Sequence, residues 1–188
     1  MISDAHSRLR DATQLHHHRL EDRVDLLRRI ANPAGRRDVV ERFHAFHTGA
    51  EAGLAPWLAG LAALDFETRR RTPWLTRDLA AMGGRPHTNL TSPVAPRSVS
   101  EALGLMYVLE GSTLGGRVIR RHVEAAGGDM AGLSFLDPYG DRVGERWRSF
   151  LAVLQAEARS EADLLAMTVG AVAGFQGAEL QLCEAADA

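Results

Sequence analysis

The chain of 188 residues lacks features that would place it in several well-known classes of protein. It has one cysteine, Cys183, which excludes an internal disulfide framework and fits a reducing compartment. No run approaches the roughly 20 apolar residues of a membrane-spanning helix. The N-terminal stretch is charged and has no apolar core of the kind found in signal peptides. We therefore expect a cytoplasmic protein that does not act in a membrane.

Lysine is also absent, so arginine supplies all 22 Lys and Arg positions. The formal net charge of −2 argues against general binding of nucleic acids. The chain has neither a phosphate-binding loop nor a G-x-S-x-G nucleophile motif. Ser112 follows a glycine, but it lies in a helical pattern without the strand that a hydrolase nucleophile needs.

Sustained alternation of apolar and polar residues is missing, whereas spacings of three and four residues recur along the chain. We predict an all-α, single-domain bundle of six to seven helices over residues 1–188. The expected helices cover residues 4–30, 35–64, 72–82, 98–127, 142–158 and 160–184. Pro56 is expected to kink the second helix. The proline-rich residues 85–97 are expected to form an extended loop.

One predicted helix is unusual because several glycines share a face of it. It begins at Ser98-x-x-Glu101, a capping-box pattern. The residues spaced three or four apart are Gly104, Val108, Gly111, Ser112 and Gly115, with Gly116 adjoining. Glycine inside a helix costs roughly 1 kcal/mol relative to alanine, so this face indicates a close approach to the backbone. Either a bulky, flat ligand lies against it or another helix packs there.

The first predicted helix carries a histidine on its inward face. Arg10, Thr13 and His17 lie on this face, followed by Leu20, Val24 and Leu27. Glu21 is placed to accept a hydrogen bond from His17, an arrangement that leaves the second ring nitrogen free to bind iron. Arg10 is placed to meet an acidic group of a ligand. The alternatives are a solvated histidine at position 17 and competition from His16 on the adjacent row.

The remaining histidines give weaker signals. His16, His17 and His18 are consecutive, and neighbouring helix residues point about 100° apart, so the three do not share one metal on a regular helix. His44 and His47 are three residues apart among phenylalanines. We expect hydrogen-bonded or surface roles for this pair rather than a metal site.

Three strings together resemble the heme oxygenase family. AT-x-x-x-H-x-x-x-E, residues 12–21, resembles the proximal segment of the family and selects His17 over His16 as the ligand. YVLEGSTLGG, residues 107–116, resembles the distal segment of the bacterial branch associated with bacteriophytochromes. WLTRDLAAMG, residues 74–83, resembles the middle helix of that branch. The strings follow the family's order and span most of the chain.

The resemblance implies an enzyme that cleaves heme b, both substrate and cofactor, to biliverdin, ferrous iron and carbon monoxide. Electrons would come from an external donor such as a ferredoxin or a reductase. His17 would bind the iron and Glu21 would orient it, while Gly111, Gly115 and Gly116 would let the distal helix approach the heme. The other implied heme contacts are Arg10 and Arg148 at the propionates, with Thr13 and Val108.

One position departs from the family pattern. Many members have an aspartate where this chain has Ser112, and that aspartate anchors a water network that delivers protons. The resemblance therefore implies that Ser112, beside Gly111, and ordered waters take over this role. A heme-binding or heme-carrier protein of the same fold remains an alternative. So does a helical protein without heme, such as a vitamin-processing enzyme of similar fold or an interaction module.

The resemblance implies two protein partners, an electron donor and a bacteriophytochrome that takes up the bilin product as its chromophore. Iron acquisition is the alternative purpose of heme cleavage. Candidate residues for docking an acidic ferredoxin are Arg8, Arg10, Arg19, Arg117, Arg120 and Arg121. Solvated helix faces are the alternative interpretation of these arginines.

Overall fold

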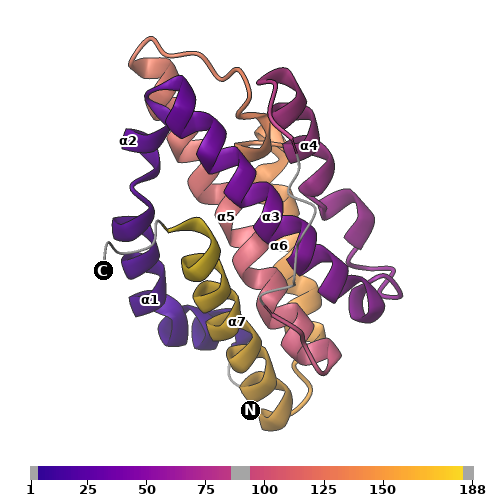
Figure 1. Ribbon diagram of the computed structural model, residues 1–188. Coiled ribbons are helices and arrows are strands. Elements are labelled where there is room, and N and C mark those ends of the chain that lie inside the picture. The colour runs from indigo at the N-terminus through magenta and orange to yellow at the C-terminus, as the bar shows by residue number, and fades with distance from the viewer. Residues whose placement is uncertain (1–3, 86–93, 184–188) are drawn as a thin grey trace.

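The computed structural model describes residues 4–85 and 94–183 (Figure 1). Within these ranges it contains seven α-helices and no strand, which confirms the all-α prediction. The helices are α1 (Ala5–Val24), α2 (Leu26–Ile30), α3 (Pro33–Leu58), α4 (Thr72–Ala81), α5 (Val99–Ala125), α6 (Val143–Glu157) and α7 (Glu161–Leu182). Short 3-10 segments are η1 (Phe66–Arg69), η2 (Ser134–Leu136) and η3 (Gly140–Arg142). The loop expected over residues 85–97 lies largely outside the described residues.

The prediction of one helix over residues 4–30 is wrong. Asp25 adopts a left-handed conformation, with φ of 43°, and separates α1 from the single-turn helix α2. A short polar side chain tolerates this conformation better than most. The break changes the direction of the chain just after the segment that carries His17. Nothing in the helical pattern of residues 20–30 indicates it.

Local capping explains where α3 begins, and its end corrects a second prediction. The Asn32 side chain accepts a hydrogen bond from the Gly35 amide at 2.9 Å, and Pro33 occupies the first helical turn. The helix ends at Leu58 rather than at residue 64. Pro56 therefore lies in the last turn of α3 rather than within a longer helix. Asp65, with φ of 53°, then leads into η1.

Helix α5 begins as predicted but with half of the capping box. Ser98 Oγ accepts from the Glu101 amide at 3.1 Å, whereas the Glu101 carboxylate accepts from the Arg97 amide at 2.9 Å instead of that of Ser98. The helix runs through the middle of the bundle, and α7 packs against both α5 and α1 (Figure 1).

Glycines allow α5 and α7 to meet backbone to backbone. A Cβ atom at Gly104 would lie 1.9 Å from the Met167 carbonyl oxygen, and one at Gly170 would lie 2.0 Å from that of Glu101. For Gly104 the helix-packing interpretation of the glycine face is therefore correct. None of the described helices has the length and apolar character required to cross a bilayer.

Candidate functional site

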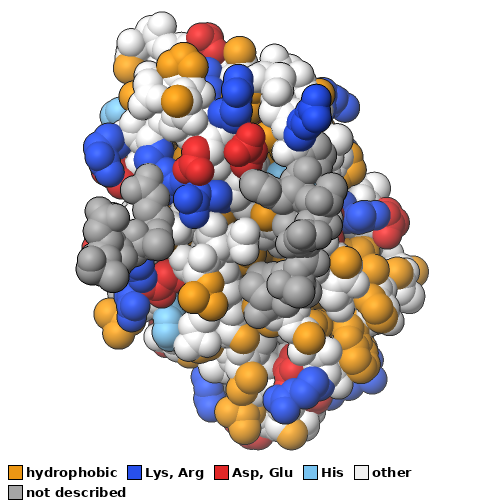
Figure 2. Space-filling view, in the orientation of Figure 1, with side chains coloured by type: hydrophobic (Ala, Val, Ile, Leu, Met, Phe, Trp, Pro, Cys, Tyr) orange, Lys and Arg blue, Asp and Glu red, His pale blue; other side chains and the backbone are white. Residues whose placement is uncertain are grey.

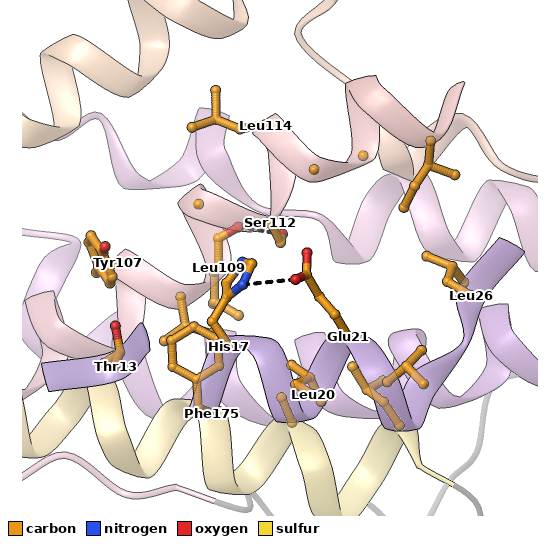
Figure 3. Close-up of a pocket in the computed structure, with 18 of the residues that line it drawn as sticks. Thr13, His17, Leu20, Glu21, Leu26, Tyr107, Leu109, Ser112, Leu114 and Phe175 are labelled. Carbon is orange, nitrogen blue, oxygen red and sulfur yellow. Dashed lines mark hydrogen bonds and ion pairs between the residues drawn. The ribbon is translucent and has the colours of Figure 1, made fainter. Parts of the chain in front are cut away.

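A cavity of about 1090 Å³ lies between α1 and α5, with further walls from α3, α6 and α7 (Figure 3). Ligand pockets for small molecules commonly have volumes of about 300–1,000 Å³, so this one suits a large ligand. It brings together most of the residues singled out in the sequence: Arg10, Thr13, His17, Glu21, Val108, Gly111, Ser112, Gly115 and Gly116. Phenylalanines 43, 46, 135 and 175 supply much of the apolar wall.

His17 lines the cavity from α1 and contacts an acidic residue of its own helix. Its Nδ1 lies 3.2 Å from Glu21 Oε2, one helical turn away, so the predicted contact is present (Figure 3). Its ring packs edge to face on Phe175, with centroids 5.7 Å apart. A proton on Nδ1, held by the carboxylate, leaves Nε2 as the nitrogen with a free lone pair. Of the three consecutive histidines, His17 and His18 line the cavity and His16 does not.

Among the residues that the structure describes, no three His, Cys, Asp or Glu side chains are grouped as ligands of a bare ion. In a porphyrin, the macrocycle supplies most of the ligands of the iron, and the protein can supply a single histidine.

Two glycines of α5 face this cavity with bare backbone. Around a Cβ atom built on Gly115 there is no other atom within 4 Å, and at Gly111 the nearest is an edge carbon of Trp147 at 3.8 Å. Gly116 differs, because its Cβ would lie 2.0 Å from the Leu136 carbonyl oxygen. Gly116 borders the cavity, but packing against η2 is enough to require glycine there. The ligand-facing interpretation thus fits Gly111 and Gly115 best.

The hydroxyls on the two facing helices are both tied to their own helices. Ser112 Oγ donates to the Leu109 carbonyl at 2.7 Å, and Thr13 Oγ1 donates to the Leu9 carbonyl at 2.7 Å. With its proton engaged, Ser112 offers lone pairs to the cavity and therefore acts there as an acceptor. Figure 3 shows His17 and Ser112 on opposite sides of this space.

The two arginines expected at carboxylates of the ligand are placed differently. Arg10 lines the cavity, and its side chain is exposed, with Nε 3.4 Å from the Asp11 carboxylate. Arg148 is exposed on α6 and does not line the cavity. Its neighbour Trp147 faces the cavity instead. The orientation of α6 about its axis determines which of these two neighbours faces the cavity. The sequence pattern of α6 did not predict this orientation.

A buried polar pair at the inner end of the cavity was not predicted as part of the site. His47 lines the cavity, and burial lowers its pKa, so its imidazole is neutral. Its Nδ1 lies 3.6 Å from Glu51 Oε1. His44, in turn, contacts Thr76 at 3.1 Å, in agreement with the expected hydrogen-bonded role.

Glu51 fixes the start of α4 next to this histidine. Its Oε1 accepts from the amides of Arg71 at 2.5 Å and Thr72 at 3.1 Å. Burial alone would raise the pKa of Glu51, but its interaction with the nearby His47 and the hydrogen bonds from these two amides outweigh burial and lower the pKa to about 2. The carboxylate is therefore ionised and serves as the N-terminal cap of α4.

Arg71, the last residue of the charged stretch ETRRR (residues 67–71), also lines the cavity. It is 2% exposed, its guanidinium carbon lies 4.6 Å from the centroid of the Tyr139 ring, and neither Nη atom has a hydrogen-bond partner among the described residues. Tyr139 donates to Glu110 at 2.7 Å, and Glu110 forms a buried ion pair with Arg69 at 2.7 Å. Two arginines of the ETRRR stretch are thus buried. Only tertiary packing determines this.

Comparison with known proteins agrees with this geometry. A heme oxygenase of Xanthomonas campestris pv. campestris (strain 8004) is 36% identical over 152 residues, which cover 80% of this chain and 88% of that protein. The crystal structures of the NO- and CO-bound heme oxygenase from Neisseria meningitidis give a similar fold, with a TM-score of 0.82 over 96% of this chain and 90% of that one. The sequence identity there is 22%. No protein-family profile matches the chain.

Proposed function

Because this chain belongs to the heme oxygenase family, we propose that it binds heme between α1 and α5 and cleaves it to biliverdin, ferrous iron and carbon monoxide. One observation carries the proposal. His17, with one ring nitrogen 3.2 Å from the Glu21 carboxylate, and the bare backbone of Gly111 and Gly115 line one cavity large enough for a macrocycle. Heme, when bound, supplies both the iron that activates oxygen and the carbon that is oxidised.

On the α1 side, the chain's contribution is a fixed tautomer. Glu21 lies 3.2 Å from His17 Nδ1 and would favour the tautomer with the proton on that nitrogen, so Nε2 would be the nitrogen that binds the iron. Phe175 packs on the ring and restricts its rotation. Arg10, the cavity-lining arginine of this helix, is placed to meet a propionate. Arg148 is not part of the proposed contact set, because its side chain lies outside the cavity.

On the α5 side, the chain's contributions are close approach and proton supply. Gly111 and Gly115 let the helix backbone lie near a flat ring, and Val108 lines the same wall. Ser112 Oγ is an acceptor that can hold a water molecule in the place where many relatives have an aspartate. The neutral imidazole of His47 is a second group of the cavity wall that can pass a proton.

Electrons are proposed to come from a separate protein such as a ferredoxin or a reductase. The arginines suggested for docking are mostly engaged within the chain: Arg117 pairs with Asp141 at 2.8 Å, and Arg120 with Asp137 at 3.1 Å. On the face shown in Figure 2, basic and acidic side chains lie interspersed. Supply of a bilin to a bacteriophytochrome, a cytoplasmic location and a single domain over residues 1–188 remain predictions from the sequence.

The second candidate is a heme carrier of the same fold, and Ser112 in place of an aspartate favours it. A visible spectrum of the protein with one equivalent of hemin, followed by ascorbate in air, separates the candidates. The enzyme gives a Soret band that decays into the broad red absorption of biliverdin. A stable Soret band would mean a carrier, and the absence of a Soret band would mean a helical protein that does not use heme.

A further inference from the structure

Trp147 closes one end of the glycine face of α5. It projects from α6 into the cavity, and its ring-edge carbons Cη2 and Cζ3 lie 3.8 and 3.9 Å from the position of a Gly111 Cβ. These are ordinary van der Waals distances, so the indole edge rests directly against this part of α5. A flat ligand on the bare backbone of Gly111 would therefore meet the indole at its border.

Aromatic contacts from three helices hold this indole in place. His6 of α1 meets it edge to face at a centroid distance of 5.7 Å, and Tyr107 of α5 lies at 5.6 Å. Phe150 of α6, which is fully buried, supports it at 5.7 Å. These distances fall in the range of favourable aromatic pairs. A side chain held from three directions is a rigid boundary rather than a movable cover.

The other end of the glycine face is bordered differently. Gly115, one turn and about 6 Å further along α5, has no atom within 4 Å of its Cβ position. Beyond Gly115 along α5, the cavity is lined by Gly116, Val118 and Ile119, of which Val118 is exposed and Ile119 half-buried. A flat ligand on this face would thus meet the edge of the indole at Gly111 and aliphatic side chains beyond Gly115.

We propose that Trp147 is a positioning residue that stops the macrocycle at the α6 end of the cavity and thereby decides which meso carbon lies beneath α5. The inference rests on the proposed function, because it concerns how the same heme is seated. The four meso carbons differ only in the substituents near them, so in-plane placement selects among them. Arg10 is the polar candidate for this selection. Because its side chain is exposed, solvent weakens its ion pair with a carboxylate, whereas the packed indole blocks the ring by direct contact.

The test measures the isomers of biliverdin formed by Trp147→Ala and Trp147→Phe. With the boundary removed, the macrocycle can shift toward α6, so we expect minor isomers to rise at least fivefold relative to the major one in Trp147→Ala. Trp147→Phe should give a smaller rise in minor isomers, because the smaller phenyl ring still fills part of the space of the indole. The control is Trp74→Phe, since Trp74 stacks on Arg77 at 5.0 Å and does not line the cavity. This control should keep the wild-type ratio.

A second measurement does not depend on turnover. The heme methyl resonances in the proton NMR spectrum of the ferric cyanide complex report the in-plane orientation of heme relative to its histidine. We expect shifted or doubled methyl signals in Trp147→Ala and wild-type signals in Trp74→Phe. If Trp147→Ala does not fold, the same comparison is made on Trp147→Phe.

The inference is wrong if a Trp147 variant that binds hemin keeps both the wild-type isomer ratio and the wild-type methyl shifts. Failure of the proposed function is a separate result. In that case the wild-type protein forms no biliverdin, and the methyl shifts alone decide whether Trp147 positions the ring.

Discussion

The glycines of α5 fall into two groups that differ in what surrounds them. Gly104 and Gly116 meet backbone carbonyl oxygens of α7 and η2, where a Cβ atom would lie 1.9 and 2.0 Å from oxygen. Gly111 and Gly115 have ordinary or open space at the same position and line the cavity. The first group is needed to build the bundle, and the second leaves room for a ligand. Identical residues on one helix thus serve packing in two places and binding in two others.

The largest effect on stability is expected at the packing glycines. Gly104→Ala places a methyl group against the Met167 carbonyl and forces α5 and α7 apart. Overpacking of this kind outweighs the better helix propensity of alanine, so the free energy of unfolding should fall by about 2 kcal/mol or more. Urea denaturation without hemin measures it, with Gly115→Ala as the matched control that should lose nothing. Equal stability of Gly104→Ala and wild type would contradict the distinction between packing glycines and cavity glycines.

The converse is expected at the cavity glycines. Gly115→Leu should fold with a free energy of unfolding at least equal to that of the wild type, since leucine is the better helix former by up to about 1 kcal/mol. Its side chain would occupy the space of the ligand, so hemin should bind at least tenfold more weakly, about 1.4 kcal/mol. A hemin titration followed at the Soret band measures this. Unchanged affinity would mean that the glycine face is not the binding face.

His47, which lines the cavity, and Glu51, which caps α4, should each make stability depend on pH, in different pH ranges. Burial holds the pKa of His47 below its ordinary value of 6.5. Below about pH 6.5, His47 is therefore protonated in the unfolded chain but stays neutral in the folded one. Stability should therefore fall on acidification from this point. The pKa of Glu51 is lowered from 4.5 to about 2, which adds a second loss as the pH falls through that interval.

Thermal unfolding between pH 8 and pH 3 tests both windows. His47→Gln should flatten the curve near pH 6, and Glu51→Gln should flatten it below pH 4.5 while lowering stability at neutral pH, because the cap of α4 is weakened. A melting temperature of the wild type that rises as the pH drops from 7 to 5 would contradict the predicted loss of stability.

The smallest effect is expected at Arg71, which borders the cavity without a hydrogen-bond partner for its Nη atoms among the described residues. Replacing a buried charge by an apolar side chain of similar size is often neutral or stabilising. Arg71→Met should therefore raise the free energy of unfolding of the hemin-free protein by about 1 kcal/mol. The control is Arg77→Met, at an exposed arginine in the middle of α4, which should change stability little. A clear loss in Arg71→Met would show that its stacking on Tyr139 supports the fold.

The parts of the structure that the sequence predicted well depend on local signals. The starts of α4, α5 and α7 follow from Thr72-Pro73, Ser98 and Ser160, which cap or begin helices through their nearest neighbours. The contact between His17 and Glu21 is local too, because residues four apart on a helix are neighbours.

The errors came from features that distant residues determine. The left-handed Asp25 ends α1 without a glycine or proline to mark the place, and α3 ends at Leu58 rather than at the predicted residue 64. Whether a glycine of α5 faces α7 or the cavity depends on Gly170 and Gly174, more than 50 residues later. The burial of Arg69 and Arg71, and the choice of Trp147 rather than Arg148 at the cavity, likewise follow from how helices are turned against one another.

Ligation of heme iron by His17 is tested most directly by the visible spectra of wild type and His17→Ala, each with one equivalent of hemin, before and after addition of imidazole. The wild type should give a Soret band that imidazole barely changes. His17→Ala should give a shifted, weaker band that imidazole restores toward the wild-type position, because the small base replaces the missing side chain. Identical spectra of the two proteins without imidazole would contradict the assignment of His17 as the iron ligand.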